Sequence, residues 1–97
     1  MIHKNTKFDI AVVGAGPTGI AFACGFAGTN IKVAIIDKAP MEIIANPKID
    51  GREIALNHHS IKILKKLNVW RHISNNSISA IKEARVLDGD SSYFLNF

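Results

Sequence analysis

The 97-residue sequence predicts an α/β fold that opens with two parallel strands joined by a helix. The apolar run at 8–13 predicts a buried strand, the segment at 17–27 predicts a helix, and the β-rich run at 31–36 predicts a second strand. A strand, a helix and a strand within about thirty residues form a right-handed crossover. We therefore expect the two strands to be parallel neighbours.

The first helix carries sequence signals at both of its ends. Pro17 suits the first helical position, where its missing N–H group costs nothing. Gly28 suits the left-handed conformation that ends a helix. The segment 38–51 contains two prolines and a glycine, so the sequence predicts an irregular connection after the second strand.

A second helix and a hairpin complete the predicted elements. Asn57 is a favourable N-cap for a helix that runs to Leu67, and Asn68 tolerates the left-handed conformation that follows such a helix. A short helical turn is expected at 69–73. Residues 84–97 predict a β-hairpin around an Asp-Gly turn.

The composition of the chain excludes several classes of protein and several kinds of site. The hydrophobic content of 47% predicts one modest domain with an ordinary core. The formal net charge is +4, but the basic residues are spread along the chain without interleaved aromatics, which excludes nucleic-acid binding. The single cysteine, Cys24, excludes an internal disulfide, and the four histidines have no metal-ligand spacing, so we predict no metal site. Residues 10–31 carry no charge, yet glycines interrupt any membrane-spanning helix there, which predicts a soluble protein.

The motif that carries chemistry is a glycine loop with the pattern G-x-G-x-x-G. Its residues are Gly14, Ala15, Gly16, Pro17, Thr18 and Gly19. The loop follows a predicted strand and opens a predicted helix, which is the context of a dinucleotide-binding site. Gly14 allows the tight turn, Gly16 lets a pyrophosphate approach the backbone, and Gly19 lets the helix pack closely on the sheet. The pyrophosphate would then meet the free N–H groups at the helix N-terminus.

Asp37 ends the second predicted strand, eighteen residues after Gly19. Its carboxylate is suited to accept hydrogen bonds from the ribose of an adenosine and would repel a 2′-phosphate, which disfavours NADP. Lys38 follows and is a further candidate for the cofactor site, near the adenosine, although a solvated lysine is the interpretation that we favour. The glycine loop and Asp37 alone leave FAD and NAD open.

The residues after the connection resemble a known family. Residues 50–56 have the sequence Asp-Gly-Arg-Glu-Ile-Ala-Leu, and Ser60, Leu64, Leu67, Val69 and Trp70 follow. This pattern resembles the N-terminal region of the flavin-dependent aromatic hydroxylases, which are similar in fold to para-hydroxybenzoate hydroxylase. The nearest branch is that of the ubiquinone-biosynthesis hydroxylases. Asn68 stands where the family usually has glycine.

The resemblance implies a cofactor and a domain type. It implies FAD, and a Rossmann-like, doubly wound FAD-binding domain of which this chain supplies the opening. Residues 1–79 would form an incomplete FAD-binding region, and residues 80–97 a hairpin that leads toward a substrate domain. The resemblance also implies that Arg52 approaches the FAD, and the planar guanidinium of arginine suits phosphate.

In the complete family, reduced flavin reacts with oxygen and hydroxylates an electron-rich ring. The resemblance places the pocket for that step outside these residues, so we assign no catalytic residue and expect this chain alone to be inactive. Two other functions stay open. The chain could open an NAD-linked or other two-dinucleotide oxidoreductase, or it could be a non-catalytic truncated fragment that assembles without a cofactor.

The sequence also gives expectations about partners. Sheets of few strands are seldom stable without cover, so we expect the isolated chain to self-associate through the apolar faces of 10–13 and 33–36. We expect a cytoplasmic location. Lys62, Lys65 and Lys66 fit either a solvated helix face, which we favour, or a peripheral contact with the inner face of a membrane.

Overall fold

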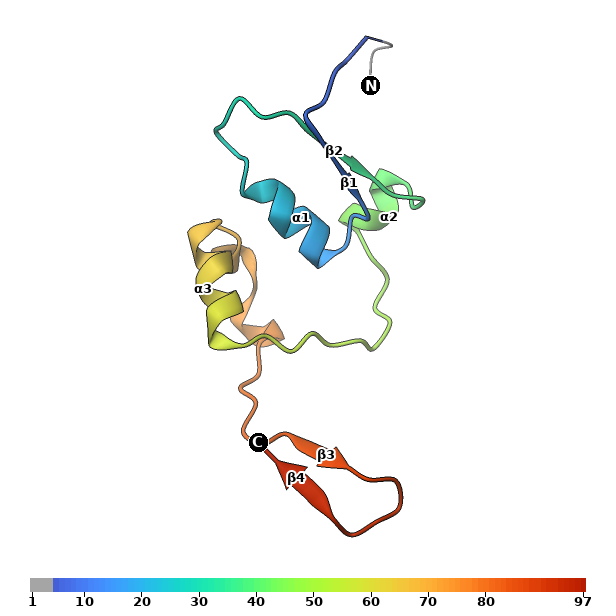
Figure 1. The fold of residues 1–97 in the computed structure, drawn as a ribbon, viewed down its shortest axis with the longest axis vertical. Helices are drawn as coiled ribbons and strands as arrows, with labels where there is room; N and C mark the ends of the chain where they lie inside the picture. The colour runs from blue at the N-terminus through green and yellow to red at the C-terminus, as the bar shows by residue number, and fades with distance from the viewer. Residues whose placement is uncertain (1–4) are drawn as a thin grey trace.

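The computed structural model describes residues 5–97 and consists of two small sheets with short helices between them (Figure 1). In chain order the elements are β1 (Ile10–Val13), α1 (Pro17–Cys24), β2 (Val33–Ile36), α2 (Met41–Ala45), α3 (His58–Lys66), the 3-10 turns η1 (Trp70–His72) and η2 (Asn75–Ser77), β3 (Arg85–Leu87) and β4 (Phe94–Asn96). Strands β1 and β2 form one sheet, and β3 and β4 form the other. The mixed α/β class that the sequence predicts is confirmed.

Strands β1 and β2 are parallel, with Ile10 opposite Val33 and Val13 opposite Ile36. Helix α1 connects them and packs against both strands (Figure 1). The predicted βαβ crossover is therefore present, although each strand is two residues shorter at its start than the sequence predicts. Just before the strands, the Asp9 carboxylate accepts a hydrogen bond from the Lys32 N–H group (2.8 Å), which links the two segments.

Helix α1 starts at the predicted proline and ends at Cys24, three residues before the predicted end. Beyond it the chain continues in tight turns, because Phe26 donates to the Ala23 carbonyl and Ala27 to the Cys24 carbonyl, both at 3.1 Å. Gly28 then adopts a left-handed conformation with φ 76°. The left-handed conformation predicted for Gly28 is confirmed, but the prediction that it ends the helix is wrong, because α1 ends at Cys24 and Gly28 follows the turn after it.

The connection after β2 contains a short helix, α2, that the sequence analysis does not predict. The Pro40 carbonyl accepts hydrogen bonds from the N–H groups of Ile43 (3.1 Å) and Ile44 (3.2 Å). Glu42 in the first turn interacts favourably with the helix dipole. The prediction of a wholly irregular segment at 38–51 is wrong for Met41–Ala45, because a five-residue helix is too short to leave a periodic pattern.

Helix α3 has the two caps that its sequence predicts. The Asn57 side chain accepts a hydrogen bond from the Ser60 N–H group at 2.8 Å. Asn68 is left-handed (φ 58°), and the N–H groups of Asn68 and Val69 donate to carbonyls of the last helical turn. This pair of hydrogen bonds is the Schellman arrangement, usually built with glycine. The predicted short helical turn follows as η1.

The C-terminal hairpin is also confirmed. Strands β3 and β4 are antiparallel, with Arg85 opposite Asn96 and Leu87 opposite Phe94. The turn between them begins at Asp88, whose carbonyl accepts a hydrogen bond from the Ser91 N–H group (3.0 Å), and Gly89 is left-handed with φ 54°.

The described residues do not form a closed core. None of their side chains is fully buried, and the radius of gyration is 18.0 Å. A compact domain of this length would have a radius of gyration of about 12–13 Å. The prediction of an ordinary core is therefore wrong, because two separate two-stranded sheets cannot cover each other's apolar faces.

Across residues 5–97, no helix combines the length and the apolar character needed to cross a membrane.

Candidate dinucleotide-binding site

The glycine loop lies where β1 ends and α1 begins. Gly14 has φ 108°, a conformation that side chains of L-residues rarely allow, and its N–H group donates to the Ile36 carbonyl at 2.7 Å. Gly16 is the N-cap of α1 and Pro17 is its first residue, as predicted. The loop therefore stands at the carboxyl ends of two parallel strands, which is where ligands bind in open α/β sheets.

The later glycines of the loop face different surroundings. A Cβ atom at Gly19 would lie well inside 3.0 Å of the Gly14 carbonyl oxygen and 3.1 Å from Val12 Cγ1. Glycine at this position is thus required for the close packing of α1 on the strand. A Cβ atom at Gly16 would meet nothing within 4 Å, so the chain leaves open space beside this residue.

The first turn of α1 leaves backbone donors free. The first hydrogen bond of the helix runs from Ile20 to the Gly16 carbonyl at 3.0 Å. Within residues 5–97, the N–H groups of Gly16, Thr18 and Gly19 have no hydrogen-bond acceptor. These groups and the positive end of the helix dipole suit an anion.

Asp37 follows directly after β2 and uses both of its carboxylate oxygens. Oδ2 accepts a hydrogen bond from the Ala15 N–H group, and Oδ1 accepts one from the Ala39 N–H group, each at 2.8 Å. These two bonds, with a smaller contribution from the neighbouring Lys38 ammonium, hold the pKa of the Asp37 carboxyl below its ordinary value. The Ala15 N–H group is therefore already occupied by the protein itself.

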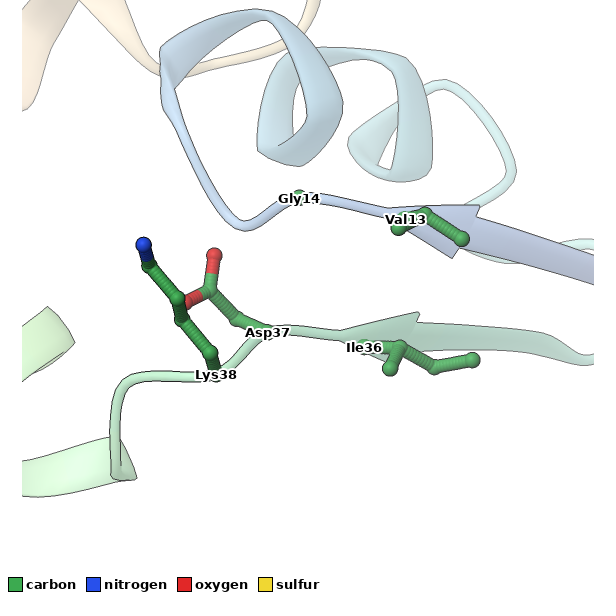
Figure 2. Close-up of a pocket in the computed structure, with 5 residues that line it drawn as sticks. All are labelled: Val13, Gly14, Ile36, Asp37 and Lys38. Atoms are coloured by element: carbon green, nitrogen blue, oxygen red, sulfur yellow. The ribbon is translucent and has the colours of Figure 1, made fainter.

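A hollow of about 310 Å³ lies at the ends of the two strands. Its lining consists of Val13, Gly14, Ile36, Asp37 and Lys38. Figure 2 shows the Asp37 carboxylate and the Lys38 side chain rising from the end of β2 on the side of the glycine loop. The structure thus brings together the start of the loop, the Asp37 that the sequence assigns to the adenosine, and its neighbour Lys38.

Arg52 lies elsewhere, in the irregular connection between α2 and α3. It lines a second hollow of about 470 Å³, formed by residues 47–53. Its Nε donates to Asp50 Oδ2 at 2.6 Å, and its backbone N–H donates to Asp50 Oδ1 at 3.0 Å. Both bonds lower the pKa of the Asp50 carboxyl, the backbone bond most.

This partner of Arg52 is absent from the sequence predictions. The left-handed Gly51 (φ 74°) between the two residues allows the chain to turn back on itself, and the Asp-Gly-Arg order was the available signal. The Arg52 side chain remains 87% exposed despite the ion pair, so its guanidinium is accessible to a ligand. Residues 5–97 hold no cluster of three or more side chains suited to a metal ion.

The arrangement of the glycine loop, the two strands and Asp37 is typical of one class of protein. A glycine loop that opens a helix beside the ends of parallel strands, with an acidic residue after the second strand, is typical of dinucleotide-binding α/β proteins. No protein-family model and no solved structure matches the chain.

Several curated proteins are similar to this chain. The chain is 47% identical over 89 residues to ubiquinone hydroxylase UbiM of Neisseria meningitidis, an alignment that covers 92% of this chain and 19% of that protein. It is 30% identical over 96 residues to the mitochondrial ubiquinone biosynthesis monooxygenase COQ6 of Dictyostelium discoideum, covering 90% and 19% of the two chains. It is 37% identical over 67 residues to 3-demethoxyubiquinol 3-hydroxylase of Escherichia coli, covering 68% and 17%.

The chain is similar to these ubiquinone-biosynthesis hydroxylases and matches only a short N-terminal portion of them. The family resemblance predicted from the sequence is confirmed. The chain spans about a fifth of the length of the curated relatives that it matches.

Proposed function

We propose that this chain is the FAD-binding N-terminal part of a flavin-dependent monooxygenase that hydroxylates an aromatic substrate of ubiquinone biosynthesis. The observation that carries the proposal is the glycine loop, open at Gly16 and placed beside Asp37, in a chain similar to these hydroxylases. The parallel β1–α1–β2 unit would then be the opening of a Rossmann-like FAD-binding domain. We propose residues 1–79 as that region and residues 80–97 as a hairpin leading toward a substrate domain.

The residues present fit a flavin dinucleotide. The pyrophosphate would lie against Gly16, where no Cβ blocks it, and accept hydrogen bonds from the free N–H groups of Thr18 and Gly19. Asp37 would accept hydrogen bonds from the adenosine ribose, because each carboxylate oxygen can accept more than the one bond it has here.

Two basic side chains would also contact the FAD. Lys38 lines the same hollow as Asp37 and would lie near the adenosine. Arg52 would approach a phosphate of the FAD, which requires its guanidinium to leave Asp50 or to share it. When bound, FAD supplies the redox chemistry that activates oxygen for ring hydroxylation, and this chain supplies binding and orientation.

The experiment that tests the proposal is an equilibrium titration of the purified chain with FAD, followed by flavin fluorescence. We expect saturable binding of FAD that excess NAD competes with only weakly. Binding of NAD in preference to FAD would support the NAD-linked oxidoreductase instead. Failure to bind either dinucleotide at millimolar concentration would contradict the proposal.

A second candidate, assembly without a cofactor, is favoured by the exposed surface of the chain. A folded monomer of this length would expose about 5,500 Å², whereas this chain exposes 9279 Å². Apolar side chains of the hairpin contribute, since Val86, Leu87, Leu95 and Phe97 are each more than half exposed. The difference of roughly 3,800 Å² per chain is larger than the area of about 1,000–2,500 Å² that each partner buries in an obligate interface. We propose that the isolated chain buries these faces against a second copy.

Light scattering at low micromolar concentration tests this self-association. We expect oligomers, and we expect Leu95→Lys, on β4, to shift them toward monomer. Ser92→Lys makes the same charge change in the hairpin turn and serves as the matched control. A stable wild-type monomer that retains FAD through gel filtration would show that the chain is a self-sufficient module.

We also propose a cytoplasmic location. A peripheral contact with a membrane would use the basic side of α3. Lys62, Lys65 and Lys66 are all exposed there. Co-sedimentation with vesicles tests this contact. Binding that requires anionic lipid and disappears at high salt would support it. If equal amounts of the protein sediment with and without vesicles, the three lysines form a solvated helix face that does not contact a membrane.

A further inference from the structure

The Asp37 carboxylate joins segments that are far apart in the sequence. Oδ2 accepts from Ala15 in the glycine loop, 22 positions earlier, and Oδ1 accepts from Ala39 at the start of the connection to α2. The neighbouring backbone bond, from Gly14 to the Ile36 carbonyl at 2.7 Å, lies directly beside this contact. The first two residues of the glycine loop are therefore both attached to the end of β2.

We propose that Asp37 is a positioning residue for the phosphate site, which acts through the Ala15 N–H group in addition to any contact with ribose. The inference rests on the proposed function, because it assigns a role within the same site. By fixing Ala15, the carboxylate fixes the backbone that leads into Gly16 and into the free N–H groups of the first turn of α1.

The need for such a contact follows from the composition of the loop. Gly14 and Gly16 give the backbone a wide choice of conformations, and binding a phosphate would have to restrict them. A loop already held in its binding conformation avoids that loss, which strengthens binding without adding a contact to the ligand. A carboxylate that accepts backbone N–H groups forms strong hydrogen bonds, so it is well suited to hold such a loop.

The two roles of Asp37 are compatible. Each carboxylate oxygen has two lone pairs, and only one on each is used by the protein. Substitution by asparagine preserves the shape of the side chain but leaves a single acceptor oxygen. Its amide group would then face either the Ala15 or the Ala39 N–H group, and one of the two links would be lost.

The chain contains a matched control at the opposite ends of the same strands. Asp9 Oδ2 accepts the Lys32 N–H group at 2.8 Å, a bond of the same kind and nearly the same sequence separation. Asp9 lies at the start of β1, away from the glycine loop. Asp9→Asn removes a carboxylate charge from the β1–β2 unit just as Asp37→Asn does, but it keeps the one acceptor oxygen that the Lys32 N–H group needs and does not touch the proposed site.

The test uses two ligands that differ only in the ribose. ADP carries the diphosphate and both ribose hydroxyl groups. 2′,3′-Dideoxy-ADP carries the same diphosphate but lacks both hydroxyl groups. Calorimetric titration of wild type, Asp37→Asn and Asp9→Asn separates the roles. We expect Asp37→Asn to weaken the dideoxy ligand about tenfold, the scale of one charge-assisted hydrogen bond. Asp9→Asn should change either affinity by less than about twofold.

Each other outcome has a definite meaning. An unchanged affinity of Asp37→Asn for the dideoxy ligand, with weaker binding of ADP, would overturn the inference and retain the proposed function. Equal losses in Asp37→Asn and Asp9→Asn would overturn the inference in favour of general support of the fold. Absence of binding by wild type would overturn the proposed function and the inference with it.

Hydrogen exchange supplies a readout that needs no ligand. We expect Asp37→Asn to speed amide exchange at Gly14 and Ala15, whose N–H groups are hydrogen-bonded to the end of β2 and to Asp37, while the amides within β2 keep the protection of wild type. Uniformly faster exchange over the whole β1–α1–β2 unit would contradict a local positioning role. Unchanged exchange in the loop would contradict it equally.

Discussion

Substitution of Gly19 by alanine should separate packing from ligand binding in the glycine loop. The added Cβ would meet the Gly14 carbonyl oxygen well inside 3.0 Å and Val12 Cγ1 at 3.1 Å. The Gly14 oxygen is a backbone atom, so relief of this contact requires the backbone of the loop or of α1 to shift. Overpacking of this kind costs about 1–3 kcal/mol. That cost is a large share of the stability of a unit without a closed core.

Urea unfolding followed by far-UV circular dichroism measures the cost. We expect a lower midpoint for Gly19→Ala than for wild type. Gly16→Ala is the matched control, because its Cβ would meet nothing within 4 Å and its φ of −79° suits any residue. Equal midpoints for Gly19→Ala and Gly16→Ala would refute the close helix–strand packing described here.

Three further predictions concern the acidic residues. Asp37→Ala should weaken FAD binding about tenfold in the fluorescence titration, and a change below about twofold would contradict a role in the site. Because the pKa of Asp37 is lowered in the folded chain, its contribution to stability should be complete above about pH 4 and should be lost as the pH falls through the lowered pKa. The difference in unfolding midpoint between wild type and Asp37→Asn should therefore shrink below about pH 4, and a constant difference would contradict the assignment. Asp50→Asn should free Arg52 and raise the affinity for FAD about two- to fivefold at low salt, whereas a lower affinity would place Arg52 outside the FAD site.

The sequence predicted those elements whose ends are determined locally. Asn57 and Asn68 cap α3 through bonds to their own neighbours, so their positions follow from residue type alone. The βαβ order and Asp37 at the end of β2 were likewise predictable, since each depends on short apolar runs and spacing. The similarity to ubiquinone-biosynthesis hydroxylases was visible in residues 50–56 and in the helix after them.

Features that depend on contacts across the chain could not be predicted. The spacing of Asp37 predicted its approach to a ribose, but only the structure identifies the Ala15 N–H group as its partner. The pairing of Arg52 with Asp50 depends on the left-handed Gly51; the Asp-Gly-Arg order is compatible with this turn but does not by itself specify the contact. The open arrangement of the two sheets was obscured by an ordinary hydrophobic content, which measures apolar residues but not what covers them.

The most direct test of the central claim compares FAD binding by wild type and Gly16→Val. A branched side chain at Gly16 would occupy the open space through which a pyrophosphate approaches, while its extended backbone conformation remains accessible to valine. We predict that wild type binds FAD and Asp9→Asn binds it about equally, whereas Gly16→Val loses binding and keeps its circular dichroism spectrum. Equal FAD affinity in wild type and Gly16→Val would contradict the assignment of the glycine loop as the dinucleotide site.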